Sequence, residues 1–243
     1  MSLRRRADRL LVERGLFDSR AKAQAAIAAG LVTADDVAVR KSSDEVPVEA
    51  RLRAEAAHPW VSRAGLKLAA ALDHFGFDPA GHVCLDVGAS TGGFTQVLLA
   101  RGARRVYAVD VGRGQFHASL RNEPRVMLFE ETDVRSLDAS RLPAPPDFLV
   151  VDVSFISLKL VLPPALALLR TPASFIALVK PQFEAGRRHL KKGIVRDPQV
   201  HAAVCDDMTA FVTGLGWHVA GVVPSPISGG AGNREFLLGA SRG

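Results

Sequence analysis

From residue 83 onward the chain alternates short apolar runs with stretches of helical periodicity. Near-continuous apolar runs between helices are typical of strands in a parallel sheet whose two faces are both covered. We place these strands at 83–87, 105–109, 126–130, 148–153, 174–179, 218–223 and 235–238. The pattern predicts an α/β domain built on a seven-stranded, mostly parallel sheet.

Composition restricts the class of protein further. The 243 residues are 48% hydrophobic and 23% charged, enough for one large domain or a medium domain with a small one. No apolar run approaches the ~18–20 residues of a membrane-spanning helix, and the arginines at 4–6 are not followed by the apolar segment of a secretory signal. Two cysteines cannot build a disulfide framework or a four-ligand zinc site. We therefore predict a soluble, cytoplasmic protein with no metal site and no stable membrane association.

The net charge of +6 is concentrated in two segments. The first thirty residues carry seven basic and three acidic residues, and 180–196 carry six basic and one acidic, so the rest of the chain is slightly acidic. Clustered Lys and Arg are the electrostatic footprint of nucleic-acid binding. A solvated basic surface remains the alternative for each segment.

The chain divides near His58-Pro59-Trp60-Val61, because proline disfavours helix at the residue before it. We expect a small α+β domain at 1–57, a linker at 58–61 and the larger domain at 62–243. The first domain is predicted to hold two short helices, the second at 20–29 with Ser19 as N-cap and Gly30 past its end. Short strands are expected at 31–32, 37–39 and 46–48. The larger domain is expected to open with a helix capped by Ser62.

Residues 7–15, 19–24 and 29–32 resemble the S4 domain, a small RNA-binding module. The sequence departs from that family at 33–37, where Thr-Ala-Asp-Asp-Val replaces the usual Val-Asn-Gly turn. An ordinary basic helical hairpin is the alternative. The resemblance implies RNA contacts from the basic residues of this region and the start of the next domain: Arg4, Arg6, Arg9, Arg20, Lys22 and Arg63.

A glycine-rich turn follows the first strand of the larger domain, where doubly wound folds hold an adenosine-bearing cofactor. A dinucleotide fingerprint needs glycine at position 90, which is Ser, and no Gly-Lys-Ser/Thr of a P-loop is present. The remaining acidic-x-Gly-x-x-x-Gly spacing is typical of methyltransferases that use S-adenosylmethionine (SAM). Acidic residues end three successive strands, with Asp86 expected near the SAM ammonium, Asp110 near the ribose and Asp133 near the adenine amine. The candidate cofactor residues are Asp86, Gly88, Ser90, Gly92, Gly93, Phe94, Asp110, Val111, Asp133 and Val134.

The fourth strand is followed by Asp152-Val153-Ser154-Phe155. Amino-group methyltransferases on bases carry Pro-Pro at this place, and C5 methylation of cytosine needs a nearby cysteine, so both chemistries are disfavoured. Lys67, Asp152, Lys180 and Glu235 instead resemble the Lys–Asp–Lys–Glu tetrad of FtsJ-type ribose 2′-O-methyltransferases. The segments SRAGLKL, DVGASTGGF, DVSFIS, LVKPQFE and NREF together make the chain similar to the TlyA family, with Ala64 where glycine is more usual. This resemblance implies a Rossmann-like, SAM-dependent enzyme that methylates a ribose 2′-hydroxyl of ribosomal RNA, with cytidine the usual target.

The tetrad suits this reaction because the attacking alcohol must lose its proton. Lys180 is the candidate base, as the resemblance also implies, and Lys67 would supply a neighbouring positive charge that helps keep Lys180 neutral. Asp152 and Glu235 would orient the lysines and the hydroxyl. Glycines at 186 and 193 predict a loop beside this site. Its basic side chains, expected to contact RNA phosphates, are Arg187, Arg188, Lys191 and Lys192.

Three other functions remain open from the sequence. TlyA relatives are often labelled haemolysins, which suggests a membrane-active protein, although no strongly basic amphipathic helix is present. The enzyme could instead methylate a small molecule, or the chain could bind RNA through an inactive methyltransferase fold. The resemblance implies ribosomal RNA or ribosomal subunits as the partner and no protein partner. They do not specify the nucleotide, the ribosomal subunit, the oligomeric state or which lysine accepts the proton.

Overall fold

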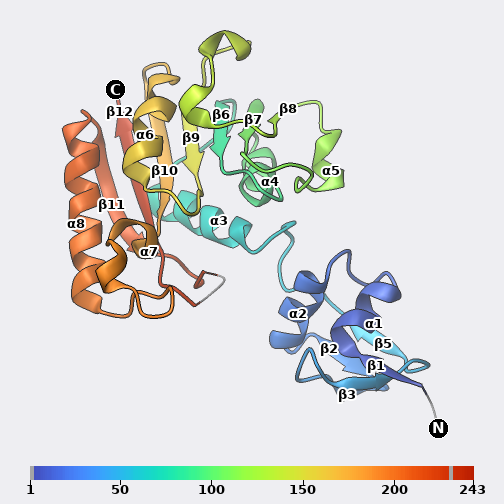
Figure 1. Cartoon of the computed structure of the whole chain (residues 1–243). Coiled ribbons are helices and arrows are strands. Elements are labelled where there is room, and N and C mark those ends of the chain that lie inside the picture. Colours follow the sequence, from blue (N-terminus) through green and yellow to red (C-terminus); the bar gives the residue numbers. More distant parts are fainter. Residues whose placement is uncertain (1–2, 230–231) are drawn as a thin grey trace. The chain divides into compact units, whose positions relative to one another are not determined.

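The computed structural model describes residues 3–229 and 232–243 and contains two compact units, Met1–Pro59 and Trp60–Gly243. The division falls inside the segment 58–61. Trp60 packs on α3 of the second unit (Ala64–Phe75), where a β-carbon added to Gly65 would lie 2.4 Å from its ring. Figure 1 shows the elements of both units.

The first unit combines two helices with short antiparallel strands. Its helices are α1 (Ala7–Glu13) and α2 (Arg20–Ala28). One sheet pairs β1 (Arg4–Arg6) with β4 (Glu45–Pro47), and the other has the order β3 (Val37–Ala38), β2 (Val32–Ala34), β5 (Leu52–Ala54). Both predicted helices are present, and α2 and three of the strands match their predicted bounds to within about two residues. The prediction missed β1 and β5, because β1 is entirely arginine and the apolar–polar–apolar alternation of β5 is only three residues long.

Two local predictions for α2 are confirmed. The Ser19 hydroxyl accepts a hydrogen bond from the Lys22 backbone N–H at 3.3 Å, which makes Ser19 the N-cap. Gly30, just past the helix, has φ +74°, the left-handed conformation that glycine adopts without steric cost. Apolar side chains of both helices and of β2 and β4 then form a small core, including Leu10, Leu11 and Ile27.

Residues 33–37, where the sequence departs from the S4 pattern, still form a β-hairpin. Strands β2 and β3 are joined by Asp35 and Asp36, which have φ of +49° and +65°. Positive φ at both central residues is the mark of a type I′ turn, and aspartate tolerates it better than most residues. The Asp35 carboxylate also accepts the Arg51 backbone N–H at 2.8 Å, which ties this turn to the start of β5.

The second unit is built on the predicted seven-stranded sheet, in the order β11-β12-β10-β9-β6-β7-β8. The five strands from β10 to β8 are parallel, and β12 runs antiparallel to both of its neighbours. The strands are β6 (Val83–Val87), β7 (Arg105–Val109), β8 (Val126–Phe129), β9 (Phe148–Val151), β10 (Ala173–Val179), β11 (His218–Pro224) and β12 (Phe236–Arg242).

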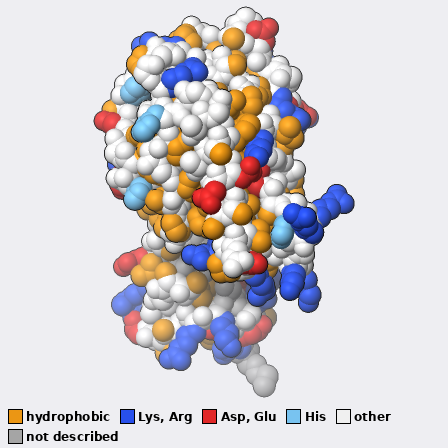
Figure 2. All heavy atoms as spheres, turned by 90° about the vertical axis from the view of Figure 1, so that its left-hand side faces the viewer, with side chains coloured by type: hydrophobic (Ala, Val, Ile, Leu, Met, Phe, Trp, Pro, Cys, Tyr) orange, Lys and Arg blue, Asp and Glu red, His pale blue; other side chains and the backbone are white. Residues whose placement is uncertain are grey.

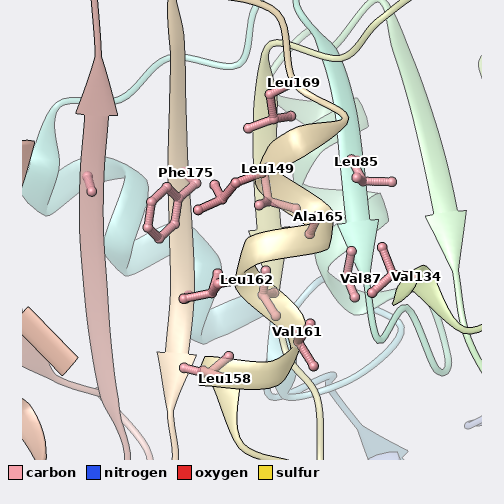
Figure 3. Close-up of a cluster of buried hydrophobic side chains, with 14 of the residues drawn as sticks. Leu85, Val87, Val134, Leu149, Leu158, Val161, Leu162, Ala165, Leu169 and Phe175 are labelled. Atoms are coloured by element: carbon pink, nitrogen blue, oxygen red, sulfur yellow. The ribbon is translucent and has the colours of Figure 1, made fainter. Parts of the chain in front are cut away.

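Helices cover both faces of this sheet, which explains the continuous apolar runs. Leu85 and Val87 of β6 belong to the core beneath α6 and α8, whereas Cys84 of the same strand belongs to the core beneath α3 and α4. Figure 3 shows α6 side chains over Leu85, Leu149 and Phe175. The remaining helices and 3₁₀ turns are α4 (Gly93–Ala100), α5 (Ala118–Arg121), η1 (Val134–Ser136), η2 (Ala139–Arg141), α6 (Leu158–Ala167), α7 (Pro181–Glu184), η3 (Arg187–His189) and α8 (Pro198–Gly214).

The prediction that Ser62 caps the first helix of this unit is wrong. Helix α3 begins at Ala64 and its N-cap position is Arg63, with no side-chain cap. The Ser62 hydroxyl instead lies against the first turn of α4, where a β-carbon added to Gly93 would be 2.2 Å away. At the other end, Gly76 closes the helix with φ +66°.

Candidate active site at the carboxyl ends of the strands

A cavity of about 370 Å³ lies where the parallel strands β6, β7 and β9 end. In open α/β sheets this edge is the usual place for ligands. Six of the ten candidate cofactor residues line it: Gly88, Ser90, Asp110, Val111, Asp133 and Val134. Asp152 and Ser154 line the same cavity, which therefore joins the candidate cofactor site to part of the tetrad.

Gly88 allows the first turn of the cavity to form. Its φ is +86°, and a β-carbon there would lie 2.4 Å from the Asp152 backbone oxygen. Any side chain would push apart the segments that follow β6 and β9. The glycine therefore sets how closely the glycine-rich turn approaches Asp152.

Asp110 is held by two backbone amides of residues that line the cavity. Its two carboxylate oxygens accept hydrogen bonds from the N–H groups of Ser90 and Gly112, each at 2.7 Å. The bond from Ser90 ties the turn after β6 to the turn after β7, and the bond from Gly112 lies within the turn after β7. The remaining lone pairs of the carboxylate are suited to accept hydrogen bonds from the hydroxyls of a ribose.

Asp133 already has a charged partner, Arg135, that sequence reasoning missed. The Arg135 guanidinium donates to the Asp133 carboxylate at 2.6 Å, and these hydrogen bonds hold the pKa of Asp133 below its usual range. The carboxylate also accepts the Arg135 backbone N–H at 2.9 Å, so it caps η1. An amine donor in the cavity would share Asp133 with this arginine.

Asp86 does not line the cavity. It is fully buried, and its Oδ2 accepts the Thr95 hydroxyl at 2.6 Å, while Oδ1 has no hydrogen-bond partner among the described residues. Burial raises the pKa of Asp86 to about 7. A direct contact from Asp86 to a bound ligand stays a prediction.

The other three candidate cofactor residues also lie outside the cavity lining. Gly92 has φ +90° and faces Leu120 and Phe116, while Phe94 is buried in the core beneath α4. Gly93 faces Ser62, as described above. These residues shape the turn and its packing, and their contact with a cofactor stays a prediction.

The sheet brings three members of the tetrad to one edge. Asp152 directly follows β9 and Lys180 directly follows the neighbouring parallel strand β10. Strands β10 and β12 are antiparallel with Val179 opposite Phe236, so the next pair in this register is Lys180 and Glu235. Lys67 reaches the same place from α3, because its side chain contacts Glu235.

The tetrad is organised as two ion pairs. Lys67 Nζ donates to Glu235 Oε2 at 2.5 Å, and Lys180 Nζ lies 2.6 Å from Asp152 Oδ1. All four side chains are at most 15% exposed. Removing one partner of such a pair leaves a charge uncompensated in a poorly solvated place, which is costly. Because breaking either pair is costly, each lysine nitrogen stays beside its carboxylate.

Three further side chains join the segments of the site, and sequence reasoning missed them. Ser154 accepts a hydrogen bond from Lys180 Nζ at 2.9 Å. Glu184 accepts the Ser157 hydroxyl at 2.5 Å and the Leu158 backbone N–H at 2.8 Å, which joins α7 to the start of α6. Asn233 is buried and bridges to the backbone of Gly193 and Val195. Only the occurrence of these residues inside DVSFIS, LVKPQFE and NREF pointed to them.

Two of the basic candidates of the first unit, Arg6 and Arg20, contact a buried carboxylate. Asp8 is fully buried, and its oxygens accept hydrogen bonds from Arg6 at 3.1 Å, Arg20 at 2.7 Å and the Gln24 amide at 2.8 Å. Of the others, Arg4 donates to the Glu45 backbone carbonyl, Lys22 pairs with Asp18, and Arg9 is exposed.

The remaining basic candidates lie in the second unit. Arg63 is exposed at the start of α3. The segment between α7 and α8 is a loop with one 3₁₀ turn, as the glycines predicted, and its candidate side chains are exposed: Arg187, Arg188, Lys191 and Lys192. Figure 2 shows Lys and Arg side chains, in blue, projecting from the surface of both units.

Neither cysteine is suited to act as a nucleophile. Cys84 is fully buried inside β6, and burial raises the pKa of its thiol strongly. Burial also raises the pKa of Cys205, within α8, to about 11. A raised pKa keeps the thiol protonated and therefore poorly nucleophilic, which agrees with the expectation that cytosine C5 methylation is disfavoured.

The comparisons with known proteins agree with this site. A family model described as FtsJ-like methyltransferase matches residues 60–242. The chain belongs to the FtsJ-like methyltransferase family. The family implies SAM as the methyl donor, as the sequence predicted. Across the described residues 3–229 and 232–243, no helix is both long and apolar enough to cross a membrane.

Relatives match across almost the whole chain. The chain is 44% identical over 98% of its length to the 16S/23S rRNA (cytidine-2′-O)-methyltransferase TlyA of Mycobacterium tuberculosis and covers 90% of that protein. It is 36% identical over 96% of its length to Hemolysin A of Brachyspira hyodysenteriae, covering 98% of it. A solved structure of a candidate hemolysin from Streptococcus thermophilus matches the full chain and 90% of its own, with 39% identity and a TM-score of 0.78. The resemblance to the TlyA family is thereby confirmed.

Proposed function

We propose that this protein transfers a methyl group from SAM to the 2′-hydroxyl of a cytidine in ribosomal RNA. The observation that carries the proposal is the buried Lys180–Asp152 ion pair, because Asp152 also lines a cavity suited to an adenosine-bearing cofactor. The buried Lys67–Glu235 pair adjoins it in the strand register. The name of the relative in M. tuberculosis supports both the ribosomal substrate and the cytidine.

The cavity fits the proposed cofactor. Asp110 offers carboxylate oxygens for ribose hydroxyls, and Val111, 72% exposed at the cavity, offers an apolar surface for an adenine ring. Gly88 leaves room for close approach to the backbone. When bound, SAM supplies an electrophilic methyl group.

Within the site, Lys180 in its amine form takes the proton of the 2′-hydroxyl. Asp152 holds the lysine nitrogen at 2.6 Å and stabilises the ammonium that forms when the proton arrives. Glu235 lies opposite Lys180 in the strand register and is paired with Lys67 from α3. General base assistance of this kind contributes roughly 10²–10⁴-fold to the rate.

RNA would be held by the two basic surfaces. We assign the first unit as an S4-like RNA-binding domain and the loop 187–192 as a contact to phosphates near the reacting ribose. Phe155, 91% exposed and 5.2 Å from the ring of Phe183, lines the cavity and offers an aromatic face to an unpaired base. We place the activity at ribosomes in the cytoplasm, without a stable membrane association or a protein partner.

The test is methylation of ribosomal subunits from a strain that lacks the protein, followed by mapping of 2′-O-methyl sites. Lys180→Ala is expected to lower transfer by at least about 10²-fold while calorimetry shows nearly unchanged SAM binding. Lys159→Ala serves as the matched control, because Lys159 is partly exposed on α6 and pairs with Asp207. Full turnover by Lys180→Ala would overturn the assignment of the base.

A second measurement tests the RNA interface. Replacing Lys191 and Lys192 together by alanine is expected to reduce the salt dependence of RNA binding, by roughly 0.7–0.9 in logarithmic slope for each phosphate that the variant no longer neutralises. Affinity that does not change between low and high salt would contradict an electrostatic RNA interface. A liposome-leakage assay on the same protein preparation tests the membrane activity that the hemolysin names suggest.

A further inference from the structure

Ser154 adds a second oxygen to the environment of Lys180. Lys180 Nζ lies 2.6 Å from Asp152 Oδ1 and donates to Ser154 Oγ at 2.9 Å. Asp152 and Ser154 stand two residues apart in the segment that follows β9, and both line the cavity. The lysine nitrogen is therefore held from two directions by one short segment.

These two contacts determine the direction of the lone pair on Lys180 Nζ in the amine form. A lysine nitrogen is tetrahedral, with one bond to carbon and three further directions that carry hydrogens in the ammonium form. Asp152 and Ser154 occupy two of the three. In the amine form the two remaining N–H bonds stay on these oxygens, so the lone pair is left in the third direction. With Asp152 alone, the nitrogen could rotate about its bond to carbon and place the lone pair elsewhere.

The segment that carries Ser154 is held by its surroundings. Phe155 has φ +64°, a left-handed conformation that is costly for a bulky side chain and persists only where neighbouring contacts impose it. The contacts lie on both sides of this residue, with Lys180 on Ser154 and Glu184 on Ser157 and Leu158. The 180–184 segment thus fixes the turn that presents Ser154.

We infer that Ser154 is a positioning residue that aims the lone pair of Lys180 at the acceptor hydroxyl. The inference rests on the proposed function for its consequence in catalysis, but the restraint on Lys180 itself does not. Ser154 acts through Lys180 and takes no proton in the reaction.

The experiment compares wild type, Ser154→Ala, Ser154→Thr and the control Ser140→Ala, which changes an exposed serine in η2. The first readout is the motion of the Lys180 ammonium group, followed by NMR on protein with ¹⁵N-labelled lysine and assigned with Lys180→Arg. We expect restricted rotation in wild type, Ser154→Thr and Ser140→Ala, and faster rotation in Ser154→Ala. Equal rotation in wild type and Ser154→Ala would overturn the inference.

The second readout is the single-turnover rate of methyl transfer to ribosomal subunits. Ser154→Ala is expected to lower the rate about 10-fold with SAM and RNA affinities unchanged, and Ser154→Thr is expected to restore most of it. A rate equal to wild type in Ser154→Ala, or a loss that threonine does not restore, would overturn the catalytic role. If wild type itself transfers no methyl group to ribosomal RNA, the proposed function fails, and the NMR readout still decides whether Ser154 restrains Lys180.

Discussion

Among the residues that the structure describes, each unit has one aspartate with no exposed surface, and the pKa values of these two carboxyl groups shift in opposite directions. Asp8 of the first unit accepts hydrogen bonds from Arg6, Arg20 and Gln24, and these partners hold its pKa well below the usual range. Asp86 of the second unit has only Thr95 as a hydrogen-bonding partner among the described residues, and burial raises its pKa to about 7. Burial disfavours the charged form in both places, so the partners decide the sign of the shift.

The opposite pKa shifts of Asp8 and Asp86 correspond to two different structural roles of a buried carboxyl group. Asp8 stays ionised and holds two arginines of a basic surface in fixed positions. Asp86 lies beneath the glycine-rich turn of the cavity and is the only one of the three strand-end acids that is fully buried. Each acid of the tetrad has one lysine as its ion-pair partner.

The largest expected effect is on the pH dependence of the second unit. Because the pKa of Asp86 is raised in the folded chain, this chain binds more protons than the unfolded one between about pH 4 and pH 7. The contribution of Asp86 to the free energy of unfolding therefore falls as pH rises through that window, by roughly 2–4 kcal/mol. Asp86→Asn removes this titration, and urea unfolding from pH 4 to 8 measures the difference from wild type. Asp73→Asn, at an exposed acid on α3, is the control. If the free energy of unfolding changes with pH equally in wild type and Asp86→Asn, Asp86 does not have a raised pKa.

The next effect concerns Asp8. Asp8→Ala leaves Arg6 and Arg20 without their shared carboxylate and is expected to destabilise the first unit by about 2–3 kcal/mol, less than a fully buried pair because both arginines are partly exposed. Amide hydrogen exchange in α1 and α2 measures this loss in the full chain. The control Asp18→Ala, at an exposed pair with Lys22, is expected to cost less than about 0.5 kcal/mol. Because the pKa of Asp8 is lower in the folded chain than in the unfolded one, Asp8 contributes fully to the free energy of unfolding above about pH 4. This contribution is lost only as the pH falls below that value. A loss between pH 7 and pH 5 would refute that sign.

Thr95→Val tests whether the Thr95 hydroxyl stabilises the ionised form of Asp86. Valine keeps the shape of the side chain but removes the hydroxyl that donates to Asp86 Oδ2. The ionised carboxylate loses a donor, so the pKa of Asp86 is expected to rise further and the free energy of unfolding at pH 8 to fall by about 1–2 kcal/mol. At pH 5, where Asp86 is protonated, a smaller change is expected. The same loss at both pH values would show that the hydroxyl does not act on the ionised form.

The smallest effect tests whether Asp86 responds to a bound cofactor. A positive ammonium group near Asp86 would favour its ionised form, so binding of SAM at pH 7 is expected to release up to about half a proton. Calorimetry in buffers of different ionisation enthalpy measures this release, and Asp86→Asn is expected to abolish it. Identical heats in all buffers for wild type would argue against the predicted contact between Asp86 and the cofactor.

Much of the fold followed from local pattern. Strands β6 and β7 were predicted to the residue, because their apolar runs are buried on both faces and end at sharp turns. The start of α3 was not, because Ser62 has the right chemistry for a cap but contacts the first turn of α4 instead. A cap depends on where the side chain finds a partner, and that partner belongs to another helix.

The candidate site shows the same limit. Asp110 directly follows β7 and Asp133 lies in the segment after β8, at the N-cap of η1, but nothing local indicated that Arg135 would occupy the Asp133 carboxylate. Likewise the motif predicted a tetrad, while its division into Lys67–Glu235 and Lys180–Asp152 is a property of the folded chain.

The family, the parallel sheet and the residue types available near the ends of its strands can all be inferred from the amino-acid sequence. Each of these is encoded by short-range pattern, such as apolar runs, glycine spacing and motif letters. Tertiary structure alone decided which charges meet: Lys67 and Glu235 are 168 residues apart and come within 2.5 Å only when α3 and β12 pack together. The energy of a charge depends on its neighbours and its exposure to water, and both are set by the packing of distant segments.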